Sequence, residues 1–167
     1  MRLRLILMRH AKSSWNSGAT DDHARPLNGR GRHDAPRIAA RLVELDWQPK
    51  LILSSDAQRT RETCDLVTAE LSKTTPTVFL PSMYHGGVAE VAQAILAVET
   101  AYNPIMAVGH NPGWEEAVGW WTGESIGMTT ANAALLEIDR DDWPSAIHAN
   151  EQWTLVEVLR PKELDEH

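Results

Sequence analysis

Two arginines and two histidines in this chain are suited to holding and attacking a phosphoryl group. Arg9 and His10 are adjacent, whereas Arg59 and His110 follow far along the chain. A guanidinium holds phosphate oxygens through a planar fork of N–H donors. A neutral imidazole can attack phosphorus and carry the phosphoryl group covalently. If the fold brings these side chains together, they predict phosphoryl-transfer chemistry, in which positioning and charge neutralisation supply most of the catalysis.

Each of these residues follows a short apolar segment that has the character of a buried strand. The segments are 3–8, 51–53 and 104–108, and Arg59 lies just inside a helix expected after the second. Ligands of open α/β sheets bind outside the carboxyl ends of the strands. We therefore expect the two arginines and the two histidines to converge at one edge of the sheet.

The remaining elements alternate in the manner of an α/β protein. Further strands are predicted at 78–80, 134–138 and 154–159. Four helices are predicted. The first runs from Asn28, a candidate N-cap, to about residue 45, and the second follows polar N-cap candidates at 54–56. The third follows residues 86–87, and the fourth begins at Pro112. This alternation predicts a sheet covered by helices on both faces. Residues 12–28 are polar and predict a long functional loop.

Composition narrows the class of protein. The chain has 167 residues, 43% of them hydrophobic, which fits one domain. Its formal charge of -7 disfavours a nucleic-acid partner. The single cysteine, Cys64, lies on an apolar helical stripe, so a buried core thiol is favoured over a nucleophile. The sequence contains no recognisable signal peptide, membrane span, metal motif or cofactor motif, and cytoplasmic residence is expected.

Four segments, in this order, resemble one known family. They are Met-Arg-His-Ala-Lys-Ser-Ser-Trp at 8–15, Asp-His-Ala-Arg-Pro-Leu at 22–27, Ser-Ser-Asp-Ala-Gln-Arg-Thr-Arg-Glu-Thr at 54–63 and Val-Gly-His-Asn-Pro-Gly at 108–113. Over residues 3–160 the chain resembles the histidine phosphatase superfamily, in particular its small SixA-like phosphohistidine phosphatase branch. The resemblance implies a single histidine-phosphatase domain over 1–167 with a phosphoglycerate-mutase-like α/β sandwich. Its central sheet would be mixed and mostly parallel, without a large cap insertion.

The resemblance also implies roles for individual residues. His10 would be the nucleophile that becomes phosphorylated, and Arg9 and Arg59 would grip the phosphoryl oxygens. His110 would donate a hydrogen bond to the phosphate and stabilise charge in the transition state. No metal or other cofactor is implied.

Three further residues match the family near the pocket with less defined roles. Asp22 and Arg25 belong to its Asp-x-x-Arg-Pro-Leu signature. Arg25 would either contact phosphate or bridge to Asp22, and an ion pair that only orders the loop is the competing interpretation. Lys12 would either extend the positive field of the pocket or be a solvated loop residue.

The sequence departs from the family where many members carry an acid for the leaving group. Residues 81–87 contain no carboxylate, which leaves Asp22 as the favoured candidate over Glu90. His85 would share this work at the pocket rim, or be purely structural. Expelling an alkoxide calls for a proton, whereas the imidazole of a phosphoramidate leaves more readily and can already carry a proton on its other nitrogen. The missing acid therefore favours phosphohistidine as the substrate.

The short connection between Leu71 and Tyr84 predicts an unroofed site, which suits a phosphoryl group displayed on another protein and disfavours a mutase. The predicted function is a phosphohistidine phosphatase of phosphoproteins that binds phosphate or sulfate in its pocket and needs no nucleic acid or membrane. A phosphatase of small phosphomonoesters is the nearest alternative. A weak phosphate-binding or phosphoprotein-binding module is a third, although it would have no use for the nucleophile His10.

Overall fold

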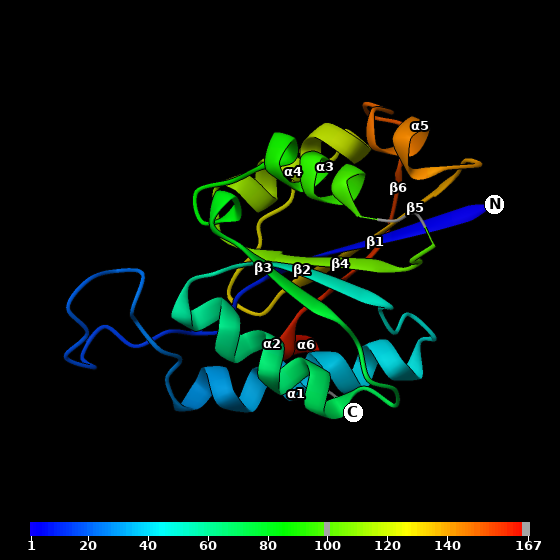
Figure 1. Cartoon of the computed structure of the whole chain (residues 1–167). Helices are drawn as coiled ribbons and strands as arrows, with labels where there is room; N and C mark the ends of the chain where they lie inside the picture. The colour runs from blue at the N-terminus through cyan, green and yellow to red at the C-terminus, as the bar shows by residue number, and fades with distance from the viewer. Residues whose placement is uncertain (99–100, 165–167) are drawn as a thin grey trace.

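A six-stranded sheet lies between two layers of helices in the computed structural model of the chain, which describes residues 1–98 and 101–164 (Figure 1). The strand order is β3-β2-β4-β1-β5-β6. The β1–β4, β4–β2 and β2–β3 pairs are parallel, and β5 and β6 are added antiparallel, so the predicted mixed, mostly parallel sheet is confirmed. The strands are β1 (Arg2–Arg9), β2 (Leu51–Ser55), β3 (Thr77–Leu80), β4 (Ile105–Gly109), β5 (Ala133–Asp139) and β6 (Thr154–Leu159).

The helices divide between the two faces of the sheet. α1, α2 and α6 lie on one face, and α3, α4 and α5 lie on the other (Figure 1). Their bounds are α1 (Gly29–Glu44), α2 (Gln58–Glu70), α3 (Val88–Ala97), α4 (Gly113–Thr122), α5 (Trp143–Ile147) and α6 (Pro161–Leu164), with a 3-10 turn η1 (Pro81–Met83) after β3. The two short helices and η1 were not predicted, because so few residues carry no periodic signal. Within the described ranges, no helix is long and apolar enough to cross a membrane.

Strand β1 supplies side chains to both cores. Leu5 and Leu7 pack in the cluster that includes α3 and α4, whereas Ile6 and Met8 pack in the cluster that includes α1. Successive side chains of a strand point to opposite faces, so a strand covered on both faces must be apolar throughout. Cys64 is buried in the second cluster, which confirms its prediction as a core thiol.

The starts of α1 and α2 differ in how well the sequence predicted them. Asn28 caps α1, and its side-chain oxygen accepts a hydrogen bond from the Gly31 N–H at 2.9 Å, as expected. The N-cap predicted for α2 at 54–56 is wrong, because Ser54 and Ser55 belong to β2 and Ala57 is the N-cap. The Ser55 hydroxyl is therefore available to a different partner.

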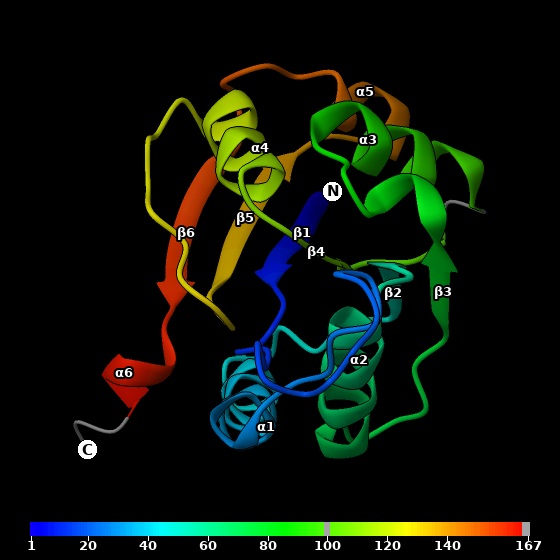
Figure 2. The same cartoon turned by 90° about the vertical axis from the view of Figure 1, so that its left-hand side faces the viewer.

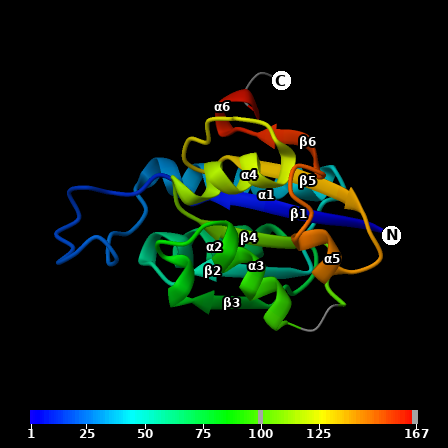
Figure 3. The same ribbon diagram turned by 90° about the horizontal axis from the view of Figure 1, so that it is seen from above.

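The segment between β1 and α1 reaches beyond the carboxyl ends of the parallel strands. Figure 2 looks onto this end of the sheet and shows the segment, in blue, crossing in front of β2 and α2. The view from above shows it projecting past the tip of β1 (Figure 3). A bridge between Ser13 and Leu27 ties its two arms together. This loop is therefore positioned to cover residues at the ends of the central strands.

Candidate active site

His10 follows the last residue of β1 and presents one ring nitrogen to the site. Its Nδ1 atom lies 2.7 Å from the carbonyl oxygen of Ala11. Because a carbonyl can only accept a hydrogen bond, Nδ1 carries the proton and Nε2 keeps its lone pair. The Nε atom of Arg59 donates toward that Nε2 at 3.4 Å, which agrees with this tautomer. The ring is only 6% exposed, so the backbone contact and the packing fix its orientation.

The surroundings keep both histidines of the site neutral. Burial lowers the pKa of His10 to about 3, and the charges of Arg59 and Arg9 act in the same direction. Burial also lowers the pKa of His110 to about 3, with His10 and Arg59 adding to the effect. The two ring centres lie 5.2 Å apart. At neutral pH His10 is therefore in the form that can act as a nucleophile.

His110 follows β4 and is anchored by β2. Its Nε2 atom lies 2.9 Å from the hydroxyl oxygen of Ser55, which also accepts a hydrogen bond from the N–H of Ala57. Among the described residues, the buried Nδ1 atom of His110 has no hydrogen-bond partner. The ring is thus held from one side, and its other nitrogen is available to a substrate oxygen.

Arg59 links the nucleophile to the loop. It lies in the first turn of α2, and its side chain is 7% exposed. Its Nη1 atom donates to the carbonyl oxygen of Asp22 at 2.8 Å, and its Nη2 atom donates to Oδ2 of the same residue at 3.0 Å. One guanidinium therefore contacts both the nucleophilic nitrogen and a carboxylate.

Asp22 is held as a carboxylate by three side chains. Besides Arg59, the phenol of Tyr84 donates to Oδ2 at 2.5 Å and Nε of Arg25 donates to Oδ1 at 3.0 Å. The Tyr84 hydrogen bond, followed by those from Arg25 and Arg59, holds the pKa of Asp22 well below its usual range. The predicted bridge between Arg25 and Asp22 is present. The structure argues against Asp22 as the proton donor, because a carboxyl group held ionised has no proton to give.

Arg25 is itself fixed by the loop around it. Its Nη1 atom donates to the hydroxyl of Ser13 at 2.8 Å, and its guanidinium stacks on the ring of Trp15, 3.6 Å from the ring centre. Trp15 is 73% exposed. The aromatic ring therefore covers one face of the Arg25 guanidinium, whose Nε atom donates to Asp22.

A hollow of about 550 Å³ opens beside this cluster. Asp22, Arg59 and His110 form one part of its lining, and the rest comes from the segments before α3 and α4 and from the first turns of these helices. The loop before α3 touches the start of α4 closely, because a Cβ atom placed on Gly113 would lie 2.0 Å from the carbonyl oxygen of Gly86. His85 also lines this hollow, with its ring centre 4.2 Å from that of Tyr84.

Arg9 and Lys12 do not line the hollow beside Asp22, unlike Arg59 and His110. Arg9 donates to the carbonyl oxygen of Met128 at 3.0 Å, and with Lys12 it lines a second hollow of about 260 Å³ that also includes Arg30 and Lys162. The charge of Arg9 still reaches His10 and contributes to its lowered pKa. Lys12 lines this second hollow and not the one beside Asp22.

Two residues of the site were not singled out from the sequence. Tyr84 lies in the segment whose only predicted feature is the missing carboxylate, and the sequence around Ser55 predicts a helix cap instead of a contact with His110. The aromatic position directly before the predicted rim residue His85 was the available signal for Tyr84. Within residues 1–98 and 101–164, no group of three or more His, Cys, Asp or Glu side chains could hold a metal ion.

Comparison with known proteins identifies the family to which this arrangement belongs. The model of the histidine phosphatase superfamily (branch 1) matches residues 5–125. The chain belongs to this superfamily. The protein is therefore a phosphatase. Its fold and the convergence of His10 with Arg59 and His110 agree with this activity.

Solved structures and a plant relative add detail to this membership. A candidate phosphohistidine phosphatase SixA from Agrobacterium tumefaciens is 29% identical, with a TM-score of 0.77 over 95% of this chain and 98% of that one. The protein histidine phosphatase SixA in complex with tungstate shares the fold, with 21% identity and a TM-score of 0.79 over 97% and 99% of the two chains. An uncharacterised chloroplastic protein of Arabidopsis thaliana is 43% identical over 152 residues, which are 86% of this chain and 70% of that protein.

Proposed function

We propose that this histidine phosphatase removes phosphoryl groups from phosphohistidine on other proteins, through a covalent phosphohistidyl intermediate at His10. The observation that carries the proposal is the state of the His10 ring. Nδ1 is tied to the Ala11 carbonyl, and the lone pair of Nε2 faces Arg59 in a ring whose pKa is lowered to about 3. Such a ring is prepared to attack an electrophile that brings its own negative charge to the guanidinium.

The first step transfers the phosphoryl group to the enzyme. Nε2 of His10 forms a bond to phosphorus, and the bond from phosphorus to the substrate's ring nitrogen breaks, with its electron pair going to that nitrogen. Arg59 and the free nitrogen of His110 hold the phosphoryl oxygens. The Ala11 carbonyl stabilises the positive charge that develops on the His10 ring.

The second step returns the enzyme to its starting state. Water attacks phosphorus, the bond to Nε2 breaks, and inorganic phosphate leaves while Nε2 regains its electron pair. The segment from Leu71 to Tyr84 contains only β3 and η1, so it adds no long helix that would roof the hollow and exclude water from the intermediate. This access favours hydrolysis over retransfer to a second substrate.

Two observations support phosphohistidine over an alkyl phosphate ester. Residues 81–87 contain no carboxylate, and Asp22 is held ionised by Tyr84, Arg25 and Arg59. A departing imidazole needs a strong proton donor less than an alkoxide does. The similarity to the Agrobacterium protein, whose description names phosphohistidine, supports the same substrate class.

The test compares substrates and follows the label. A phosphohistidine-bearing protein should release phosphate and transiently label the enzyme on histidine, in a bond that is acid-labile and alkali-stable, and an alkyl phosphate should be turned over far more slowly. His10→Asn should abolish both release and labelling, whereas His33→Gln, an exposed position on α1, should leave both unchanged.

Three results would contradict parts of the proposal. Full turnover by His10→Asn would exclude the covalent mechanism. Preference for the alkyl phosphate would favour the small-phosphomonoester alternative. Tight binding of the phosphoprotein without turnover would favour the binding module.

A further inference from the structure

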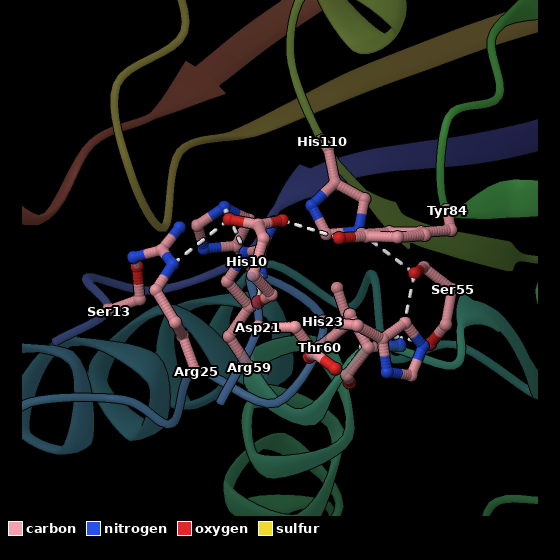
Figure 4. Close-up of polar contacts among 12 residues, drawn as sticks. His10, Ser13, Asp21, His23, Arg25, Ser55, Arg59, Thr60, Tyr84 and His110 are labelled. Atoms are coloured by element: carbon pink, nitrogen blue, oxygen red, sulfur yellow. Dashed lines mark hydrogen bonds and ion pairs between the residues drawn. The ribbon is translucent and has the colours of Figure 1, made fainter. Parts of the chain in front are cut away.

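The carboxylate of Asp22 occupies the hydrogen-bond donors that a phosphoryl group needs. Oδ1 accepts from Arg25, and Oδ2 accepts from both Arg59 and Tyr84. Figure 4 shows these donors and the rings of His10 and His110 converging on one small region. A carboxylate and a phosphoryl group are both bound by charge-assisted hydrogen bonds from guanidinium forks. Asp22 therefore makes the kind of contacts expected of a bound anion.

Asp22 and His10 contact the same edge of the Arg59 guanidinium, with Asp22 on the side of the hollow. Nε and Nη2 form one edge of the fork; Nε points to Nε2 of His10 at 3.4 Å, and Nη2 points to Oδ2 of Asp22 at 3.0 Å. Asp22 lines the hollow, whereas His10 is 6% exposed and does not contribute to that lining. A phosphoryl group that enters from the hollow meets the carboxylate before it reaches Nε2.

We propose that Asp22 is an internal ligand of the phosphoryl site, which the phosphoryl group of the substrate displaces, and that it sets a threshold of affinity that a phosphoryl dianion passes and a weakly bound monoanion does not. This inference rests on the proposed function, because it takes the donors around His10 as the phosphoryl site. A phosphoryl dianion has more charge and one more acceptor oxygen than a carboxylate, so it outcompetes Asp22 for Arg59 and Arg25. A carboxylate-like monoanion has no such advantage.

The loop allows this exchange. The side chain of Asp22 is 49% exposed, so the displaced carboxylate passes into water without losing its solvation. The opposing role is that of a fixed brace, in which Asp22 stays in place and aligns the two arginines for the substrate. The two roles predict opposite effects of removing the charge of Asp22 on phosphate binding.

The test measures binding of inorganic phosphate and of formate by calorimetry. Asp22→Asn should bind phosphate several-fold more tightly than the wild-type protein, because the competing charge is gone. Its affinity for formate should increase by the same factor, because every anion that takes these donors must displace the same carboxylate. The matched control is Asp21→Asn, since Asp21 only accepts a hydrogen bond from the Ala24 N–H at 2.9 Å in the same loop, and it should leave both affinities unchanged.

Asp22→Ala provides a second variant in case Asp22→Asn does not fold. It removes the carboxylate and leaves Arg25, Arg59 and Tyr84 in place as donors, so it should also tighten phosphate binding. Unchanged or weaker phosphate binding by whichever of the two variants folds would overturn the inference in favour of the brace. This outcome leaves the proposed function intact if the wild-type protein binds phosphate and becomes labelled on His10. If the wild-type protein neither binds phosphate nor becomes labelled, both proposals are contradicted.

Discussion

At the scale of single residues, the site depends on which hydrogen bonds are already made. His10 is fixed through Nδ1 and His110 through Nε2, so each ring leaves its other nitrogen to the reaction. Arg59 is more heavily engaged, because its Nε, Nη1 and Nη2 atoms all have partners within the protein. Two of these contacts are to Asp22. If the phosphoryl group displaces Asp22 as proposed, Arg59 exchanges partners during catalysis, whereas the histidines need not move.

Removing the guanidinium of Arg59 should slow catalysis without unfolding the protein. We expect Arg59→Ala to lower kcat/KM by about 10²–10³-fold, the effect of losing one preorganised donor to transition-state charge. Arg59→Lys should recover little, because an ammonium cannot reproduce the fork. Steady-state phosphate release measures the effect.

The matched control for this loss is Arg61→Ala on the same helix. Arg61 is exposed, donates to the carbonyl oxygen of Asp56 and stacks on Phe79, away from His10. It should keep wild-type kcat/KM. Equal losses in the two variants would mean that Arg59 acts through the stability of α2 rather than through the substrate.

The site residues that could be predicted from the sequence are those that follow apolar strand segments. His10, Arg59 and His110 were found this way, and the structure brings them together. The partners that fix them were not found, because the contacts of Ser55 with His110 and of Tyr84 with Asp22 join residues distant in sequence. For the same reason, the ionised state of Asp22 depends on donors from three separate elements and could not be inferred from its own segment.

At the scale of elements, the site depends on close contact between a loop and the start of a helix. The loop before α3 meets the first residue of α4, where Gly113 lies against the backbone of Gly86. Only glycine fits there, because a Cβ atom would overlap a carbonyl oxygen that cannot rotate away. This contact sets one wall of the hollow.

A methyl group at this contact should push the start of α4 away from the loop before α3. We expect Gly113→Ala to destabilise the protein by about 1–3 kcal/mol, as overpacking does, and to reduce activity at the same time. Gly119→Ala on the same helix is the control, because the nearest atom to its Cβ would be 3.7 Å away. It should be neutral or stabilising by about 0.5–1 kcal/mol. Urea unfolding and phosphate release measure both, and equal stability of the two variants would contradict the expectation.

The order of strands and long helices was predictable because periodic burial dominates their sequences. α1 begins at the predicted cap Asn28, and Pro36 lies inside it without ending it. The start of α2 was not predictable, because the same serines that suit a cap also fit the end of a buried strand. The short helix α5 begins with a capping contact from Asp142 to the Ser145 N–H, but five residues give no periodic signal.

At the scale of the whole molecule, the buried neutral histidines link stability to pH. The pKa values of His10 and His110 are about 3 in the folded protein and about 6.5 in the unfolded chain. Below pH 6.5 the unfolded chain therefore binds more protons than the folded protein. The free energy of unfolding is highest above pH 6.5 and falls as the pH decreases toward 3.

We expect each of these two rings to account for a loss of about 2 kcal/mol between pH 7 and pH 5. Urea unfolding at several pH values in this interval measures the slope, before the carboxylates of the unfolded chain begin to titrate. His10→Asn and His110→Asn should each flatten the curve, whereas the exposed His33→Gln should not. If the free energy of unfolding had the same pH dependence in all four proteins, the pKa values of these two rings would not be lowered by folding.

The stacking of Arg25 on Trp15 makes the fluorescence of Trp15 sensitive to the position of Arg25. Five of the seven tryptophans are buried, Trp120 is 37% exposed, and Trp15 is 73% exposed. Emission at the long-wavelength edge of the fluorescence spectrum therefore comes mainly from Trp15, whose ring is covered on one side by the guanidinium that holds Asp22. An anion that draws Arg25 away from Asp22 also moves the guanidinium on the Trp15 ring and so changes the Trp15 emission. Stopped-flow fluorescence should therefore follow substrate entry in the native protein, with Trp15→Phe as the control that lacks this signal.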